Sequence, residues 1–185
     1  MPNVIFLIVA LNIGTILGKV MDYEVEMTGM PQLVSLFNAL GGAAALIISI
    51  NEAVINIETR LSLMANITLA LGAILGGIAF TGSIVAYFKL ANKFNIGNQN
   101  TVKLFSRLLL VAIISVTVLF FTTNILGISF LSYLLHISVI SLLYGVVFTV
   151  PIGGADMPVL VSFLNAITGV ATAFSGIAFD SPIML

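Results

Sequence analysis

Two asparagines occupy equivalent positions in a stretch of sequence that occurs twice. The stretch that begins at Met30 returns without a gap at Met157, and both copies place a serine, an asparagine and a glycine at spacings of three and four residues. These residues are Ser35, Asn38 and Gly42 in the first copy and Ser162, Asn165 and Gly169 in the second. Such spacings put each set on one face of a helix. Neutral amides and hydroxyls on one face could hold water and relay protons without a permanent charge.

A third polar cluster, Phe80-Thr81-Gly82-Ser83, lies in another apolar segment. At a helical rise of about 1.5 Å per residue, each repeated asparagine lies about 12 Å from the start of its helix. Ser83 lies about 9 Å from Lys89 at the end of its own helix, so all three groups are expected at one depth. An alternative interpretation stays open: these amides and hydroxyls could only join helices or bond to a carbonyl one turn away.

Asp156 follows two glycines and directly precedes the second copy of the repeat. The simplest interpretation is an N-cap, with Pro158 in the first turn, where a missing backbone donor is harmless. In the first copy Gly29 takes the place of Asp156, so the repeat does not need this cap to fold. A carboxylate at this end of the bundle is therefore expected to have a further, specific role.

The other groups that could do chemistry are few. His136 is the only histidine, and no second titratable residue is placed to be its partner, so a structural or incidental role is the simplest interpretation. The sequence has no cysteine, no cluster of metal ligands, no Ser-His-Asp arrangement and no glycine-rich phosphate loop after a strand. We therefore expect this chain itself to bind neither a metal nor a nucleotide.

Composition places these residues in a membrane. Hydrophobic residues make up 60% of the chain and charged residues 7%, whereas soluble domains carry about 25% charged residues. The formal net charge of −1 provides no basic surface for nucleic acid. The sequence therefore predicts an integral membrane protein embedded in the lipid bilayer.

Six apolar segments are long enough to cross the hydrocarbon, which takes about 20 residues per helix. They cover residues 3–19, 30–50, 63–89, 103–122, 130–150 and 157–179. Short polar breaks separate them, and no alternating pattern predicts strands. The expected fold is all-α: a polytopic transmembrane bundle of about six helices with an internal helix repeat. It forms one domain over residues 1–185, without a soluble nucleotide-binding domain.

Basic residues predict the orientation of this bundle. The third connection is flanked by Lys89, Lys93, Lys103 and Arg107, which is typical of the cytoplasmic side. Strict alternation then places the connection that carries Asp156 on the cytoplasmic side and both termini outside.

Two pairs of glycines four residues apart predict close helix packing. Gly14 pairs with Gly18, and Gly72 pairs with Gly76. Small residues at this spacing let helix backbones approach, and packing alone is the simplest interpretation.

Three motifs resemble the membrane domain of the proton-translocating NAD(P) transhydrogenase beta subunit. They stand in that family's order and at about its spacing, and the resemblance covers essentially the whole chain. The motifs are Glu26-Met27-Thr28-Gly29-Met30-Pro31-Gln32-Leu33-Val34, Phe80-Thr81-Gly82-Ser83 and Ile152-Gly153-Gly154-Ala155-Asp156-Met157-Pro158. The resemblance implies a complex that couples hydride transfer from NADH to NADP⁺ to proton movement across the membrane.

For individual residues, the resemblance implies specific roles. The family positions associated with the proton path match Asn38, Ser83 and Asn165. The groups expected from their spacing to support these residues are Ser35, Gly42, Thr81, Ser162 and Gly169. Asp156 matches the family's aspartate that faces the NADP(H)-binding domain. Some members have a titratable histidine where this chain has Asn38, which cannot carry a proton at neutral pH. The relay would then use water or a histidine on another chain.

The resemblance also implies cofactors and partners outside this chain. NADP(H) and NAD(H) would be bound by other domains or subunits of the complex. The expected partners are the transhydrogenase alpha subunit and the NADP(H)-binding domain, in a dimeric complex of the bacterial inner membrane.

The chain differs from the resembled family in length. The family's subunit has apolar segments before the equivalent of Met1, at least one more helix after that of Leu185, and a soluble Rossmann-like domain. The first repeated helix is followed by the Phe-Thr-Gly-Ser helix, whereas the second copy has no such successor. We therefore expect a fragment or a split subunit. Two alternatives remain: a small secondary transporter with a repeat-built site at the midplane, or a membrane fragment without function.

Overall fold

Six long helices account for nearly all of the described chain. The computed structural model describes residues 2–24, 29–57, 61–91, 99–123 and 128–178. The helices are α1 (Pro2–Glu24), α2 (Met30–Ile55), α3 (Leu63–Leu90), α4 (Gln99–Thr123), α5 (Phe130–Thr149) and α6 (Met157–Ala178), with a short 3₁₀ helix, η2 (Gly154–Asp156), before α6. All six are long and apolar enough to cross a membrane, and these ranges contain no strand. The predicted all-α bundle of six spanning helices is confirmed.

Several helices run beyond the predicted apolar segments. α1 continues through Asp22 to Glu24, which had been expected to form a polar break, and α2 continues to Ile55. A polar residue ends the apolar run without ending the helix, because backbone hydrogen bonds continue regardless of side-chain polarity. α5 ends at Thr149, although Val150 keeps helical dihedral angles and its N–H still donates to the Val146 carbonyl over 3.0 Å. Pro151 then has no N–H with which to continue the hydrogen-bond ladder. The predicted positions 93 and 179 and the motif residues 26–28 lie outside the described residues.

The predicted N-cap at Asp156 is wrong. η2 runs directly into α6, and the Asp156 N–H donates to the Gly153 carbonyl over 3.1 Å. Asp156 therefore lies inside a continuous helical turn rather than at an extended capping position. Within the described residues its carboxylate caps no backbone N–H, and the side chain is exposed.

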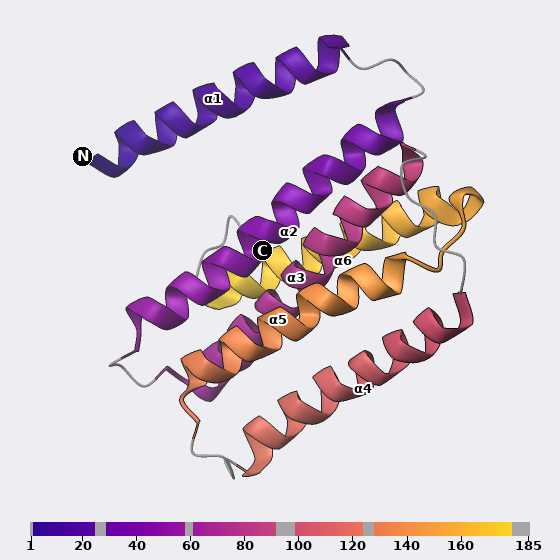
Figure 1. Ribbon diagram of the computed structural model, residues 1–185. Coiled ribbons are helices and arrows are strands. Elements are labelled where there is room, and N and C mark those ends of the chain that lie inside the picture. Colours follow the sequence, from indigo (N-terminus) through magenta and orange to yellow (C-terminus); the bar gives the residue numbers. More distant parts are fainter. Residues whose placement is uncertain (1, 25–28, 58–60, 92–98, 124–127, 179–185) are drawn as a thin grey trace.

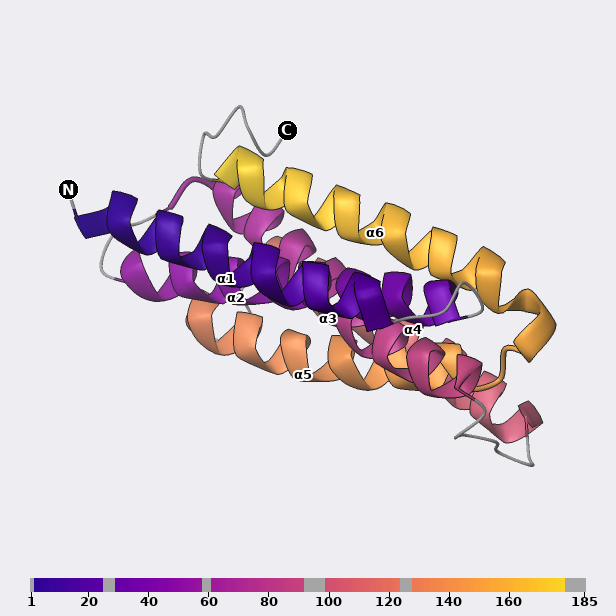
Figure 2. The ribbon, with the colours of Figure 1, turned by 90° about the horizontal axis from the view of Figure 1, so that it is seen from above.

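α3 is the central helix of the bundle. In its spanning segment 72% of the residues are buried, against 6% in α4 and none in α1. α2, α5 and α6 all contact α3, and α5 and α6 lie on opposite sides of it (Figure 2). α4 packs along the outer side of α5, where Phe120 stacks on Tyr133 with ring centroids 4.1 Å apart. α1 stands apart from the other helices (Figure 1).

Glycines bring the backbones of α2 and α3 into direct contact. A Cβ atom added at Gly42 would lie 2.7 Å from the Phe80 nitrogen and 2.8 Å from the Gly76 oxygen. One added at Gly72 would lie 2.6 Å from the Ser49 hydroxyl oxygen. The packing role predicted for Gly72 and Gly76 is confirmed.

The glycines of α1 and of the second repeat differ from this. Nothing in the described part of the chain lies within 4 Å of a Cβ atom added at Gly14, Gly18 or Gly169. The close packing expected at Gly14 and Gly18 is therefore not made within these residues.

The two copies of the repeat supply a matched pair of substitutions. Gly42→Ala should destabilise the bundle by about 1–3 kcal/mol, because the new methyl meets backbone atoms that cannot yield. Gly169→Ala should not destabilise the bundle and should stabilise it by up to about 1 kcal/mol, because its methyl enters open space and alanine favours a helix interior. Unfolding of each variant in mixed detergent–SDS micelles measures the difference, and equal stabilities would contradict the α2–α3 contact.

Candidate functional site

The centre of the bundle holds a buried pair of polar side chains, Asn38 on α2 and Ser83 on α3. The Asn38 amide Nδ2 donates to the Ser83 hydroxyl oxygen over 2.8 Å. The Ser35 hydroxyl, one turn earlier on α2, donates to the Ser83 carbonyl over 2.8 Å. All three side chains are buried, with Asn38 6% exposed and Ser83 1% exposed. The predicted common depth of Asn38 and Ser83 is confirmed, and the predicted face of the first repeat copy turns toward α3.

The Asn38 amide has one end without a partner. Its Oδ1 is buried and accepts no hydrogen bond. A buried polar atom left unpaired costs about 1–3 kcal/mol, which favours a further polar group at this position. Reversing the amide does not remove the deficit, because the Ser83 hydroxyl can donate as well as accept and the NH₂ group would then lack a partner. Asn38 can therefore bridge Ser83 to one more polar group, such as water.

Thr81 does not join this pair. Its hydroxyl lies near the carbonyls of Gly77, one turn back on α3 (3.1 Å), and Leu142 on α5 (2.7 Å). The alternative interpretation, that a hydroxyl here only bonds to a nearby carbonyl and joins helices, describes Thr81 correctly. Its position in the motif serves the α3–α5 contact.

The second copy of the repeat faces the other way. Leu164 lies 3.1 Å from a Cβ atom added at Gly82, so α6 passes α3 beside Ser83 and Asn165 has the predicted level. The Asn165 and Ser162 side chains are nevertheless exposed, on the face opposite Leu164 and Leu160. Within the described residues the Asn165 amide has no hydrogen-bond partner. The structure thus brings Ser35, Asn38 and Ser83 together and leaves Ser162, Asn165 and Gly169 on the outer surface.

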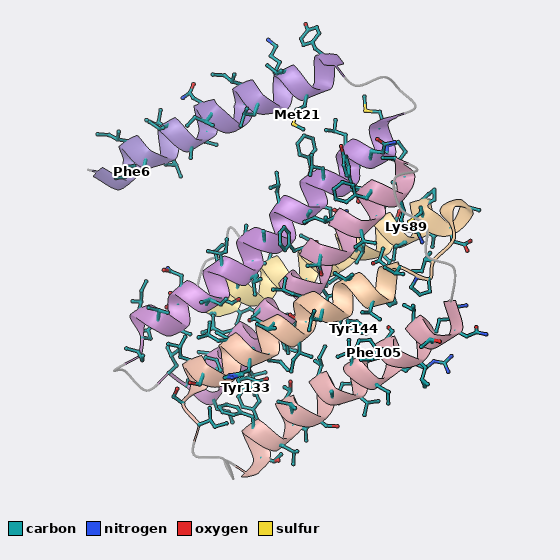
Figure 3. The ribbon with its side chains drawn as sticks, in the orientation of Figure 1. Phe6, Met21, Lys89, Phe105, Tyr133 and Tyr144 are labelled. Carbon is teal, nitrogen blue, oxygen red and sulfur yellow. The ribbon has the colours of Figure 1, made fainter. Side chains whose placement is uncertain are left out.

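Lys89 makes two polar contacts that the sequence did not predict. Its ammonium donates to the carbonyls of Val150 and Ile152, each over 2.6 Å. Figure 3 shows Lys89 at the end of α3, beside the connection between α5 and α6. On the other side, the Gln32 amide of α2 donates to the Leu90 carbonyl over 3.1 Å. The same end of the bundle carries the exposed Asp156.

His136 lies outside this arrangement. Its side chain is exposed on α5, and its Nδ1 lies 2.6 Å from the Ser132 carbonyl oxygen one turn earlier in the same helix. The structural or incidental role expected for His136 stays a prediction. The described residues contain no group of three or more His, Asp or Glu side chains that could hold a metal ion.

Comparisons with known proteins agree with the motifs. The sequence profile of the NAD(P) transhydrogenase beta subunit family matches residues 1–185. Two curated relatives named NAD(P) transhydrogenase subunit beta, from Rhodospirillum rubrum and from a defined strain of that species, are each 30% identical over 189 residues. The match covers 97% of this chain and 39% of each relative, so the chain spans about two fifths of their length.

A double-mutant cycle tests the buried pair. Asn38→Leu and Ser83→Ala should show a coupling free energy of about 1 kcal/mol for unfolding in micelles, because each removes one partner of a single hydrogen bond. Ser138→Ala is the matched control, since this buried hydroxyl donates to Leu134 of its own helix over 2.6 Å. Additive effects of the first two substitutions would show that the bond contributes nothing.

Proposed function

Because this chain belongs to the NAD(P) transhydrogenase beta subunit family, we propose that it is the membrane part of a proton-translocating NAD(P) transhydrogenase. The observation that supports this most is the Asn38–Ser83 hydrogen bond, which joins two segments that the motifs associate with a proton path. Hydride transfer from NADH to NADP⁺ takes place on other domains or subunits, which bind NAD(H) and NADP(H). The chain contributes the route through the membrane.

Neutral groups suit such a route. Asn38 and Ser83 do not ionise near neutral pH, so they add no permanent charge to the middle of the bilayer, where a charge is costly. Water held between the free Asn38 oxygen and neighbouring groups can pass a proton along hydrogen bonds. Because Asn38 cannot store a proton, the step that controls transfer lies elsewhere. The carboxylate of Asp156, at the end of the bundle predicted to be cytoplasmic, is the candidate that meets the NADP(H)-binding domain.

The exposed face of α6 points to a further helix. An asparagine such as Asn165 is unfavourable against hydrocarbon unless another polar group pairs with it. In the first copy, the equivalent face with Asn38 is covered by α3, the next helix in the chain. By analogy with α3, which covers the polar face of the first copy, we infer that a helix from the longer family protein or from a partner covers Asn165 and Ser162. Asn165 would then face that helix, on the side of α6 that points away from the Asn38–Ser83 pair.

The complete assembly would include more than this chain. The alpha subunit supplies the NAD(H) site, and a soluble NADP(H)-binding domain docks at the Asp156 end. We place the complex in the bacterial inner membrane as a dimer. α1, which is exposed on all sides within the described residues, leaves room for such neighbouring helices.

The function is tested by replacing Asn165 with leucine in the complete complex reconstituted in vesicles. We expect proton-coupled turnover to be abolished, because the polar group that faces the covering helix is lost. Asn12→Leu is the control, since this exposed amide bonds to the Ile8 carbonyl of its own helix over 2.8 Å. Near-normal coupling in Asn165→Leu would refute the role of Asn165. Solute uptake by this chain alone, without nucleotide-binding partners, would favour a secondary transporter instead.

A further inference from the structure

We propose that Lys89 is a positioning residue that ties the Asp156-bearing connection to α3, so that a displacement of this connection reaches the Asn38–Ser83 pair as a movement of α3. The proposal rests on the proposed function, because it identifies how an event at a nucleotide-binding domain could act on the polar pair. In this proposal Lys89 contacts neither the transferred proton nor a nucleotide.

The first element is the pair of hydrogen bonds that Lys89 makes at the end of α5 and in the connection that follows it. Val150 is the C-cap residue of α5, and the last carbonyls of a helix lack a partner within it and carry the negative end of the helix dipole. Ile152 lies beyond the helix, in the connection that leads to η2. The Lys89 ammonium satisfies the Val150 and Ile152 carbonyls, each over 2.6 Å. A charged donor makes stronger hydrogen bonds than a neutral one. Ile152 lies four residues before Asp156, so the ammonium binds the beginning of the segment that carries the carboxylate.

The second element is the tight packing of α3 against α5. The Thr81 hydroxyl donates to the Leu142 carbonyl over 2.7 Å. A Cβ atom added at Gly145 would clash with that same hydroxyl, and one added at Gly82 would lie 3.1 Å from the Thr149 hydroxyl oxygen. Backbones this close resist sliding past each other, because packed interiors transmit displacement. The end of α5 and the last turns of α3 therefore move together.

The third element is the short distance from Lys89 to the polar pair. Ser83 stands six positions earlier in the same helix (89 − 83), a rise of about 9 Å. Its hydroxyl accepts from Asn38 over 2.8 Å, and such bonds are lost beyond about 3.5 Å. A displacement of α3 of less than 1 Å relative to α2, on the order of 0.7 Å, is thus enough to open the pair. Gln32 and Ser35 hold the last turns of α3 to α2 through the Leu90 and Ser83 carbonyls. These two bonds and the backbone contact at Gly42 oppose the displacement.

A purely structural cap is the competing explanation. In that case Lys89 would only satisfy two carbonyls, and its loss would lower stability without altering how the connection and the pair influence each other. The two explanations differ in the mobility of the connection and in the number of protons moved per hydride, so both are measured.

The mobility of the connection can be measured on this chain in vesicles. The chain contains no cysteine, so Ala155→Cys introduces one unique site for a nitroxide label, on an exposed residue beside Asp156. Lys89→Met keeps an apolar stem and removes the donors. We expect it to raise the ratio of mobile to immobile label about tenfold. Lys89→Arg should restore the parent spectrum, and Lys103→Met, an exposed lysine on α4, should leave it unchanged. An unchanged spectrum in Lys89→Met would show that Lys89 does not hold the connection in place.

The functional readout uses the complete complex in the same vesicles. Lys89→Met should lower the protons moved per hydride transferred at least threefold, in proportion to the fraction of detached connections, while Lys89→Arg restores the ratio. A mobile label with an unchanged proton-to-hydride ratio would overturn the transmission to Ser83. If Lys89→Met does not fold, Lys89→Gln, which keeps a neutral donor, replaces it in both measurements.

The two proposals fail in different ways. If the parent complex transfers hydride without moving protons, the proposed function fails and the transmission role fails with it. The label spectrum of this chain still decides whether Lys89 holds the connection.

Discussion

The contact between the backbones of α2 and α3 at Gly42 and Gly76 is the constraint on which the rest of the structure depends. In a bilayer no hydrophobic force drives helices together, so association relies on close packing and on hydrogen bonds between helices. The absence of side chains at Gly42 and Gly76 lets the helices approach until the amide of Asn38 reaches the hydroxyl of Ser83. A larger residue at either glycine would separate the helices and the polar pair together.

This contact makes the two copies of the repeat unequal within the described chain. α2 turns its polar face inward, where α3 covers it, whereas α6 packs on α3 through Leu160 and Leu164 and turns Asn165 outward. α3 is held by donors from α2 on one side and donates to α5 and the following connection on the other. A central helix bonded on both sides is suited to carry a displacement from one end of the bundle to the buried pair.

Much of this arrangement was predictable, because the rise of a helix fixes the depth of each residue. Counting residues placed Asn38 and Ser83 at one level, and the structure confirms it. The direction in which Asn165 points was not predictable, since both faces of α6 are apolar enough to be buried and depth carries no information about rotation. Lys89 predicted only the orientation of the bundle. Its bonds to carbonyls depend on where α5 ends, which the apolar pattern does not specify.

The most direct measurement is proton uptake by vesicles that contain the complete complex, followed with a pH-sensitive dye while NADH reduces NADP⁺. With Ser83→Ala we expect any remaining hydride transfer to proceed without proton uptake, because Asn38 loses the hydroxyl that it binds. Ser138→Ala, which removes an equally buried hydroxyl bonded within its own helix, should retain normal uptake. Normal proton uptake per hydride in Ser83→Ala would contradict a proton path through the Asn38–Ser83 pair.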